Sequence, residues 1–210
     1  MHILLTNDDG LKAPGLQTLK RELASHDCRL TVVAPNGQRS AASHSMTINK
    51  ALYCRDESTV PGIREIAVSG TPVDCVKMAM EYFLKEDKPD LIISGINDGY
   101  NLGSDVLYSG TVSAAMEGPY YGLPAFAVSM LGMTDERCAQ TAHSSGTWSR
   151  SSSSKAASRA SPTSMCRQKG LSAWTTSASC PRRSRFTTMS SLRNATSTAA
   201  SAIVSSAIST

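Results

Sequence analysis

Residues 89–97 read PDLIISGIN, a nearly continuous apolar run. A strand whose successive side chains are apolar has both of its faces covered, which is typical of parallel sheets. The run is followed by GTVSAAMEGPYYG at 110–122, which predicts an Ala-rich helix, and by PAFAVSM at 124–130, which predicts a final strand. This strand–helix–strand order indicates a parallel sheet with helices packed against it.

The same alternation extends back to the N-terminus. Leucines at helical spacing follow a first apolar run, and Pro14 stands where the first turn of a helix tolerates proline. We expect strands at 2–6 and 28–35 with a helix at 13–26 between them, a loop at 36–47, two hairpin strands at 47–54 and 64–70, and a helix at 71–85 that is capped by Thr71. The sequence therefore predicts an α/β fold, a Rossmann-like three-layer αβα sandwich with a mostly parallel sheet.

The C-terminal third of the chain has a different composition. Residues 1–136 combine 11 Lys and Arg with all 17 acidic residues, a formal net charge of −6, whereas residues 137–210 hold the other 10 basic residues and no acid. Residues 141–210 contain 21 Ser, a composition that buries too little apolar surface to offset the entropy of ordering. We expect an α/β domain at 1–136 and an atypical Ser/Ala/Arg-rich low-complexity segment at 137–210.

Two interpretations of the segment 137–210 compete. It is either a natural, disordered basic tail that binds polyanions, or the product of a reading-frame shift near 137–143. The simultaneous loss of all acidic residues and of hydrophobic patterning favours the frame shift. The other two frames of the coding DNA decide between these interpretations, because a frame shift predicts a patterned α/β sequence in one of them.

Cysteine spacing and apolar run lengths bear on the class of protein and its location. The six cysteines include no C-x-x-C pair, and no histidine stands at zinc-finger distance from them. Met1 leads directly into a predicted strand, and no run of about 18 apolar residues occurs. We therefore expect a cytoplasmic protein with reduced thiols and no membrane partner.

Oxygen-bearing side chains follow three of the predicted strands. They belong to the segments TNDDG at 6–10, APNGQRSAASHSMT at 34–47 and INDGYNLGSDVLYSGTV at 96–112. Because the carboxyl ends of parallel strands share one edge of a sheet, these side chains can meet in space. The adjacent carboxylates of Asp8 and Asp9 repel one another unless a cation or a shared proton holds them.

Carboxylate, amide and hydroxyl oxygens suit Mg²⁺ or Mn²⁺ better than zinc. For Asp8 and Asp9 taken alone, an Asx turn or a helix cap is the alternative. The convergence of three loops favours a metal site.

Ser109, Gly110 and Thr111 stand at the start of the predicted Ala-rich helix, where backbone N–H groups, hydroxyls and a glycine form an anion site. An ordinary N-cap is the alternative, and the neighbouring metal site favours phosphate binding. His44 is either a proton donor to a leaving group or a solvated loop residue, and both remain open. No G-x-G-x-x-G motif follows the first strand, so dinucleotide binding is poorly supported.

Five segments resemble, in this order, the stationary-phase survival protein SurE family of metal-dependent nucleoside monophosphate phosphatases. They are ILLTNDDGLKAPG, VVAPNGQRSAASHSMT, SGTPVDCV, PDLIISGINDGYNLGSDVLYSGTVSAAMEG and GLPAFAVSM, and they extend from Met1 to about Met133. The resemblance implies one divalent metal ion per subunit, Mn²⁺ or Mg²⁺. It also implies hydrolysis of nucleoside 5′- and 3′-monophosphates and assembly as a homodimer or homotetramer.

The resemblance also implies roles for individual residues. It assigns metal ligation to Asp8, Asp9, Ser40 and Asn97, and phosphate binding to Asn101, Ser109, Gly110 and Thr111. Where the family usually has a Ser-Gly pair, this chain has Ser40 followed by Ala41.

We therefore expect hydrolysis of a phosphate monoester by a metal-activated water. Asp8 or Asp9 would orient this water or accept its proton, and a phospho-aspartate route is the alternative mechanism. Two other classes of function stay open: a nucleic-acid or other polyanion-binding protein that uses the basic segment 137–210, and an inactive frame-shifted product.

Overall fold

The computed structural model describes residues 1–156 and 171–176, with side chains described up to residue 145. Within this part of the chain, seven strands form one sheet in the order β3-β4-β2-β1-β5-β6-β7. The strands are β1 (His2–Thr6), β2 (Arg29–Pro35), β3 (Cys54–Asp56), β4 (Arg64–Val68), β5 (Leu91–Asp98), β6 (Ala125–Met130) and β7 (Leu171–Thr176). Strands β4, β2, β1, β5 and β6 are parallel, and only the two edge strands β3 and β7 are antiparallel to their neighbours.

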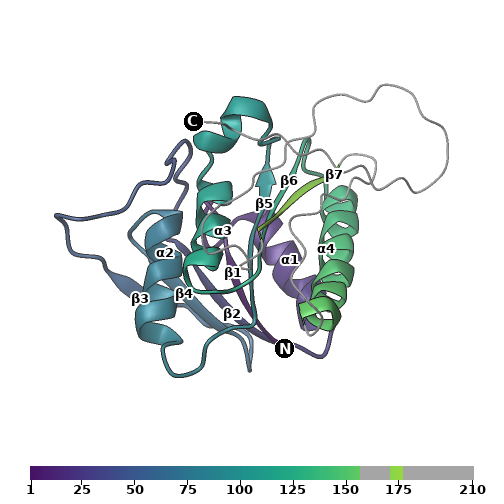
Figure 1. Cartoon of the computed structure of the whole chain (residues 1–210), viewed down its shortest axis with the longest axis horizontal. Helices are drawn as coiled ribbons and strands as arrows, with labels where there is room; N and C mark the ends of the chain where they lie inside the picture. The colour runs from purple at the N-terminus through teal and green to yellow at the C-terminus, as the bar shows by residue number, and fades with distance from the viewer. Residues whose placement is uncertain (157–170, 177–210) are drawn as a thin grey trace.

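Helices cover both faces of the sheet, as Figure 1 shows, which confirms the predicted three-layer fold. The helices are α1 (Pro14–Ala24), α2 (Pro72–Met78), the π-helix η1 (Ala79–Phe83), the 3₁₀-helix η2 (Gly103–Leu107), α3 (Gly110–Tyr120) and α4 (Asp135–Ala156). Helices α1 and α4 pack on one face, and α2 and α3 pack on the other. No helix in the described residues is both long and apolar enough to cross a membrane.

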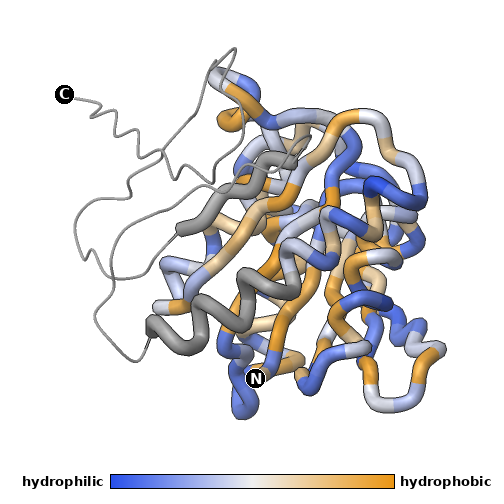
Figure 2. The backbone as a smooth tube through the Cα atoms, turned by 90° about the vertical axis from the view of Figure 1, so that its right-hand side faces the viewer, coloured by the Kyte–Doolittle hydropathy of each residue, from blue (hydrophilic) through white to orange (hydrophobic). Residues whose placement is uncertain are grey.

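The core consists of two apolar layers separated by the sheet. Successive residues of β1 alternate between them, because strand side chains point to opposite faces: Ile3 and Leu5 pack with α1, and Leu4 packs with α2 and α3. In the hydropathy view of Figure 2, apolar colour is accordingly concentrated along the central strands. The central strands β1, β2 and β5 are therefore buried on both faces, and the carboxyl ends of the parallel strands form one edge of the sheet.

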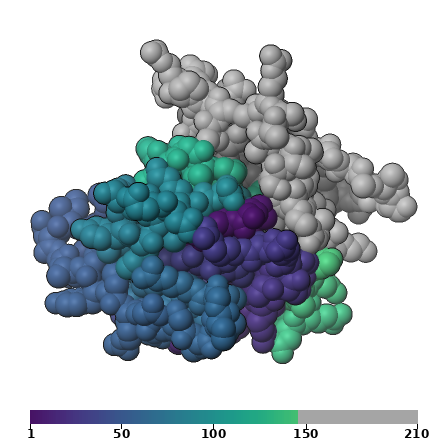
Figure 3. Space-filling model, turned by 90° about the horizontal axis from the view of Figure 1, so that it is seen from below, coloured from purple at the N-terminus to yellow at the C-terminus, as the bar shows by residue number. Residues whose placement is uncertain are grey.

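Most predicted elements are confirmed, but the hairpin is shorter than expected. Its first strand is only Cys54–Asp56, whereas residues 47–53 form no strand. This segment projects from the body of the molecule (Figures 1 and 3), and Ile48 and Tyr53 are 79% and 74% exposed. Leu52 packs at the margin of the core layer of α2 and α3, but Ile48 and Tyr53 have no sheet face to cover, so the strand prediction was wrong over 47–53.

A second difference lies at the C-terminal side of the sheet. Residues Leu171–Thr176 form β7, antiparallel to β6, although no strand was predicted after residue 130. Helix α4 runs through the predicted boundary at 136/137, and its buried side chains Cys138 and Ala142 pack into the core layer of α1. Residues 157–170 and 177–210 lie outside the described residues, so the frame-shift and disorder interpretations of the segment 137–210 stay predictions.

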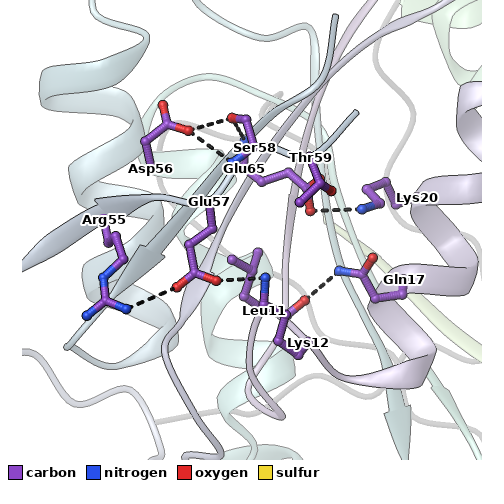
Figure 4. A network of polar contacts seen from close by, with 10 residues as sticks. All are labelled: Leu11, Lys12, Gln17, Lys20, Arg55, Asp56, Glu57, Ser58, Thr59 and Glu65. Carbon is purple, nitrogen blue, oxygen red and sulfur yellow. Dashed lines mark hydrogen bonds and ion pairs between the residues drawn. The ribbon is translucent and has the colours of Figure 1, made fainter. Parts of the chain in front are cut away.

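A polar network ties the β3–β4 hairpin to α1 (Figure 4). The Lys20 Nζ atom on α1 lies 2.8 Å from Glu65 Oε2 on β4, and both side chains are almost fully buried. Thr59 donates a second hydrogen bond to Glu65, at 3.1 Å. Nearer the surface, Lys12 pairs with Glu57 at 2.7 Å. The buried pair contributes most to stability, because a buried charge that loses its partner cannot be solvated by water instead.

We expect Glu65→Ala to lower the free energy of unfolding by about 3–5 kcal/mol, because it leaves the Lys20 ammonium buried and unpaired. Burial alone would raise the pKa of Glu65, but Lys20 outweighs it, and the pKa lies below its ordinary value. The pair therefore stabilises the fold at neutral pH, and this contribution is lost as pH falls through the titration of the carboxyl group. Urea unfolding from pH 3 to pH 7 measures both effects.

The exposed pair provides the control for this experiment. Lys12→Ala removes the partner of Glu57, and because Lys12 is 68% exposed, the cost should stay below about 1 kcal/mol. Equal losses from Glu65→Ala and Lys12→Ala would contradict the assignment of the buried pair as the dominant contact.

Candidate functional site

The first strand ends in a tight turn that carries Asp8 and Asp9. The Asn7 side chain closes this turn by donating to the Gly10 carbonyl at 3.0 Å and accepting from the Gly10 N–H at 3.1 Å. Gly10 has a φ of +105°, and a Cβ at this position would lie 3.0 Å from the Cα of Gly37. The loops after β1 and β2 can therefore approach each other only because residue 10 is a glycine.

Asp8 lies against the first turn of α3. Its carboxylate accepts a hydrogen bond from the Thr111 hydroxyl, and Asp8 is only 6% exposed. A Cβ on Gly110 would lie 2.8 Å from the Asp8 Cβ, so a side chain at residue 110 would push the helix away. The end of β1 and the N-terminus of α3 are thus joined at one carboxylate.

Asp9 lies between Asp8 and the loop after β5. Its carboxylate accepts a hydrogen bond from the Asp98 backbone N–H, and Gln38 Nε2 is 3.5 Å away. Burial, followed by the negative charge of Asp8, raises the pKa of Asp9 to about 6. Burial also raises the pKa of Asp8, although the Thr111 hydroxyl opposes the rise. Each carboxylate is therefore held in a place that disfavours its charge.

The loop after β2 is anchored beside the same carboxylates. The Arg39 backbone N–H donates to the Asp8 carbonyl at 2.7 Å. The Arg39 guanidinium holds the turn before α2 through the carbonyls of Gly70 and Ser69, each at 3.2 Å. Ser40, a predicted metal ligand, follows directly and is exposed. Ala41 has a φ of +53°, a conformation that favours glycine, where the resembled family usually has one.

Asn97 and Asn101 occupy different positions in the loop after β5. Asn97 stands beside Asp98, and its Nδ2 donates to the Gly99 carbonyl at 3.0 Å, so Oδ1 is the amide atom that could ligate a cation. Asn101 is buried, and its Nδ2 donates to the Ser129 hydroxyl of β6 at 2.6 Å. The structure therefore brings Asp8 into contact with Gly110 and Thr111, with Asp9 adjacent to it. Ser40 follows Arg39, which donates to the Asp8 carbonyl, and Asn97 precedes Asp98, whose backbone interacts with the Asp9 carboxylate. Asn101 contacts β6 through its hydrogen bond to Ser129.

The chemistry of this site fits a divalent cation. Within the described residues, none of the carboxylates of Asp8, Asp9 and Asp98 forms an ion pair with a Lys, Arg or His side chain. The hydroxyls of Thr6 and Ser94, neighbours across β1 and β5, are buried without a hydrogen-bond partner in this part of the chain. The site therefore concentrates negative charge and oxygen atoms that a cation can satisfy.

The predicted ligand set differs from a cluster of acidic, histidine or cysteine side chains. No group of three or more such residues in the described part of the chain has a metal-binding arrangement. Only Asp8 and Asp9 of the four predicted ligands belong to these residue types, since the others are Ser40 and Asn97. The donor set therefore rests on hydroxyl and amide oxygens as well as carboxylates, which is compatible with Mg²⁺ or Mn²⁺.

Residues at the start of α3 have more specific roles than the sequence indicated. The Ser109 hydroxyl accepts from the Val112 N–H at 3.1 Å, which confirms it as an N-cap. The Thr111 hydroxyl donates a hydrogen bond to the Asp8 carboxylate. Phosphate binding by Ser109, Gly110 and Thr111 stays a prediction. Because the Val112 N–H donates to Ser109 and the Thr111 N–H interacts with Asp8, the Gly110 N–H is the first-turn donor best placed for it.

Three features of the site were missed from the sequence. Asn7 closes the turn, Arg39 anchors the neighbouring loop, and His44 Nε2 lies 2.6 Å from a carboxylate oxygen of Glu117 on α3. A signal existed only for Glu117, the single charged residue in an otherwise uncharged helix. The others depend on contacts between segments far apart along the chain.

The fold and the site together define a three-layer α/β protein with an acidic centre at the carboxyl edge of a parallel sheet, next to a helix N-terminus. The model of the family described as survival protein SurE matches residues 3–165. The chain belongs to the SurE family.

Several relatives are similar to the N-terminal part of the chain. The 5'-nucleotidase SurE of Desulfitobacterium hafniense (strain DSM 10664 / DCB-2) is 56% identical over 130 residues, which are 62% of this chain and 51% of that protein. The 5'-nucleotidase SurE of Caldanaerobacter subterraneus subsp. tengcongensis is 51% identical over 128 residues, 61% of this chain and 50% of that protein. The chain thus spans about half the length of the curated relatives it matches.

A solved structure shows the same fold. The crystal structure of the SurE protein from Aquifex aeolicus matches with a TM-score of 0.65 and 40% sequence identity. The match covers 72% of this chain and 59% of that one. The predicted fold class and the predicted family are therefore both confirmed.

Without added metal, we expect Asp9→Asn to stabilise the protein above pH 6. The raised pKa of Asp9 means that the fold disfavours its charged form, so the free energy of unfolding decreases as pH rises from about 4 to about 6. The neutral amide removes this penalty, which we expect to be about 1–2 kcal/mol after solvent screening. Urea unfolding in the presence of a chelator measures it.

Asp27→Asn is the matched control, because Asp27 is exposed at the opposite edge of the sheet. The two variants and the parent should converge near pH 4. If Asp9→Asn is less stable than the parent at pH 8, with chelator present for both, the view of Asp9 as a strained carboxylate is contradicted.

Proposed function

We propose that this chain carries the catalytic centre of a divalent-metal-dependent phosphatase. Its substrates would be nucleoside 5′-monophosphates and also 3′-monophosphates, which it would hydrolyse to nucleoside and phosphate. One observation carries the proposal: Asp8 is held against the N-terminus of α3 beside Asp9, and within the described residues neither carboxylate has a basic partner. The names of the relatives, 5'-nucleotidase SurE, support the substrate class.

The proposed cofactor is one divalent ion per subunit, Mn²⁺ or Mg²⁺. Asp8, Asp9, Ser40 and Asn97 would hold it, through two carboxylates, a hydroxyl and an amide oxygen. Such an ion supplies a nucleophile at neutral pH, by lowering the pKa of water, and neutralises charge on the phosphoryl group. Neither aspartate forms an ion pair with a basic side chain in the part of the chain that the structure describes, which supports this assignment.

The chain's own residues would orient the substrate and handle the proton. The Gly110 N–H belongs to the first turn of α3, where negative charge on a phosphoryl group would be stabilised by the helix dipole, whereas the Thr111 N–H interacts with Asp8. Asn101 would contribute to phosphate binding from the loop after β5. The Thr111 hydroxyl orients Asp8 by donating to it. Asp8 or Asp9 would orient the attacking water and accept its proton, with a phospho-aspartate intermediate as the alternative.

The remaining proposals concern the protein's environment. A homodimer or homotetramer and a cytoplasmic location follow from the family resemblance, and sedimentation of the full chain tests the first of them. The rival functions, polyanion binding by the segment 137–210 and an inactive frame-shifted product, depend mainly on residues outside the described part of the chain. Nucleic acid is therefore not proposed as a partner.

Phosphate release from AMP tests the proposed activity. The full chain with Mn²⁺ should release phosphate from 5′-AMP and 3′-AMP, and Asp9→Asn should lower kcat/KM by at least about a hundredfold, since a ligand and a proton acceptor are lost together. Asp27→Asn should retain the activity of the parent. Equal activity in the parent and Asp9→Asn would exclude this site, and no activity in the parent would favour an inactive product.

The pH dependence of metal binding gives a second test. Because the pKa of Asp9 is about 6 without metal, Mn²⁺ must displace a proton below that pH. We expect the Mn²⁺ affinity to increase by about tenfold per pH unit below pH 6 and to level off above pH 7. Electron paramagnetic resonance of free Mn²⁺ measures it, and an affinity that is constant from pH 5 to pH 8 would contradict the role of Asp9.

A further inference from the structure

Glu117 is a buried carboxylate that faces two basic side chains from different segments. Its side chain is 3% exposed, with His44 Nε2 at 2.6 Å from Oε1 and Lys77 Nζ at 3.1 Å from Oε2. Burial would raise the pKa of Glu117, but His44 and Lys77 together outweigh it and keep the pKa below its ordinary value. The carboxylate is therefore charged at neutral pH, and its removal leaves two basic groups without a partner.

The surroundings of this cluster contain few other charges. Lys77 lies on α2, with its Nζ 5.9 Å from the centre of the Tyr121 ring. Tyr121 in turn interacts with Glu81, and burial raises its pKa beyond the physiological range. The groups that face Glu117 from the packed elements are thus His44 from the loop after β2, Lys77 from α2, and the neutral ring of Tyr121.

His44 belongs to the loop that carries Ser40, and this loop is fastened at several points. Ser43 donates its N–H to the Tyr108 carbonyl at 3.0 Å and its hydroxyl to the Leu107 carbonyl at 2.8 Å. Further along, the Thr47 hydroxyl donates to Asp74 at 2.6 Å. These contacts reach η2 and α2. The contact of His44 with Glu117 reaches α3 itself.

Helix α3 therefore contacts both Asp8 and the loop that carries Ser40, the two segments on either side of the proposed metal site. Gly110 and Thr111 in its first turn contact Asp8. Glu117, seven residues later, lies on the same side of the helix as Gly110 and about 10 Å along its axis. A rigid helix that holds Asp8 at one point and His44 at another fixes the distance between the carboxylates and the loop of Ser40.

We propose that Glu117 is a positioning residue that acts through His44 to hold residues 40–47 against α3, so that Ser40 is presented to Asp8 and Asp9. The inference rests on the proposed function for the identity of the bound metal, but not for the contact itself. It assigns His44 a structural contact with Glu117 in place of proton donation to a leaving group. The two roles differ in what a substitution that preserves the hydrogen bond would do.

The test measures Mn²⁺ affinity and amide hydrogen exchange on the full chain. His44→Ala and Glu117→Ala should each weaken Mn²⁺ binding by about tenfold, as expected for residues that orient a metal ligand without contacting the metal themselves. The double variant should be no weaker than Glu117→Ala alone, because both substitutions remove the same contact. Without metal, the Ser43 and Ser45 amides should exchange at least about tenfold faster in both single variants.

His44→Gln separates positioning from proton donation. A glutamine Nε2 can donate to Glu117 from nearly the same place as the histidine Nε2, but it cannot transfer a proton in the range of an imidazole. We expect Gln to restore Mn²⁺ affinity, slow amide exchange and the kcat for AMP. Restored affinity with a kcat that stays as low as in His44→Ala would overturn the assignment and make His44 a proton donor.

Lys77→Met is the matched control, since Lys77 pairs with Glu117 from α2 and, within the described residues, forms no ion pair with the loop. It should leave Mn²⁺ affinity and the exchange of Ser43 and Ser45 unchanged. Unchanged amide exchange in His44→Ala and Glu117→Ala would overturn the inference whether or not the chain hydrolyses AMP. Faster exchange in the two variants, together with a parent chain that binds no Mn²⁺ and cleaves no AMP, would support the contact while rejecting the proposed function.

Discussion

Two like charges at the end of one buried strand are the constraint around which this molecule is organised. Asp8 and Asp9 repel each other, and burial raises the pKa of both. The fold compensates only partly, through the hydroxyl of Thr111 and the backbone N–H of Asp98. A site that holds unfavourable negative charge in the absence of a ligand is stabilised when a cation binds. Strain of this kind is common at functional sites.

Helix α3 links this charge to the rest of the fold. Gly110 lets the helix approach Asp8 closely, and Glu117 contacts His44 of the loop after β2. Both contacts lie on one face of a helix that is buried along most of its length. The geometry of the site is therefore set by a rigid element instead of by the loops alone, although the loops supply most of the oxygen atoms.

The apolar pattern was sufficient to predict the central sheet, because strands covered on both faces need uninterrupted apolar runs. It failed for residues 47–53, where Leu52 packs at the margin of a core layer but Ile48 and Tyr53 are exposed, and for β7, whose six residues lie in a segment without periodicity. Helix α4 shows the same limit: Cys138 and Ala142 are buried by contact with α1, which composition alone does not reveal.

The sequence by itself determined the α/β class, the family and the convergence of three oxygen-rich loops, because strand burial and motif order are properties of the chain read along its length. Only the tertiary structure decided that the Thr111 hydroxyl donates to Asp8, that Arg39 anchors the loop after β2 by binding the Gly70 carbonyl, and that His44 contacts Glu117. These partners are separated by 31 to 103 residues, and hydrogen bonds over such separations depend on how the layers pack and not on any local pattern.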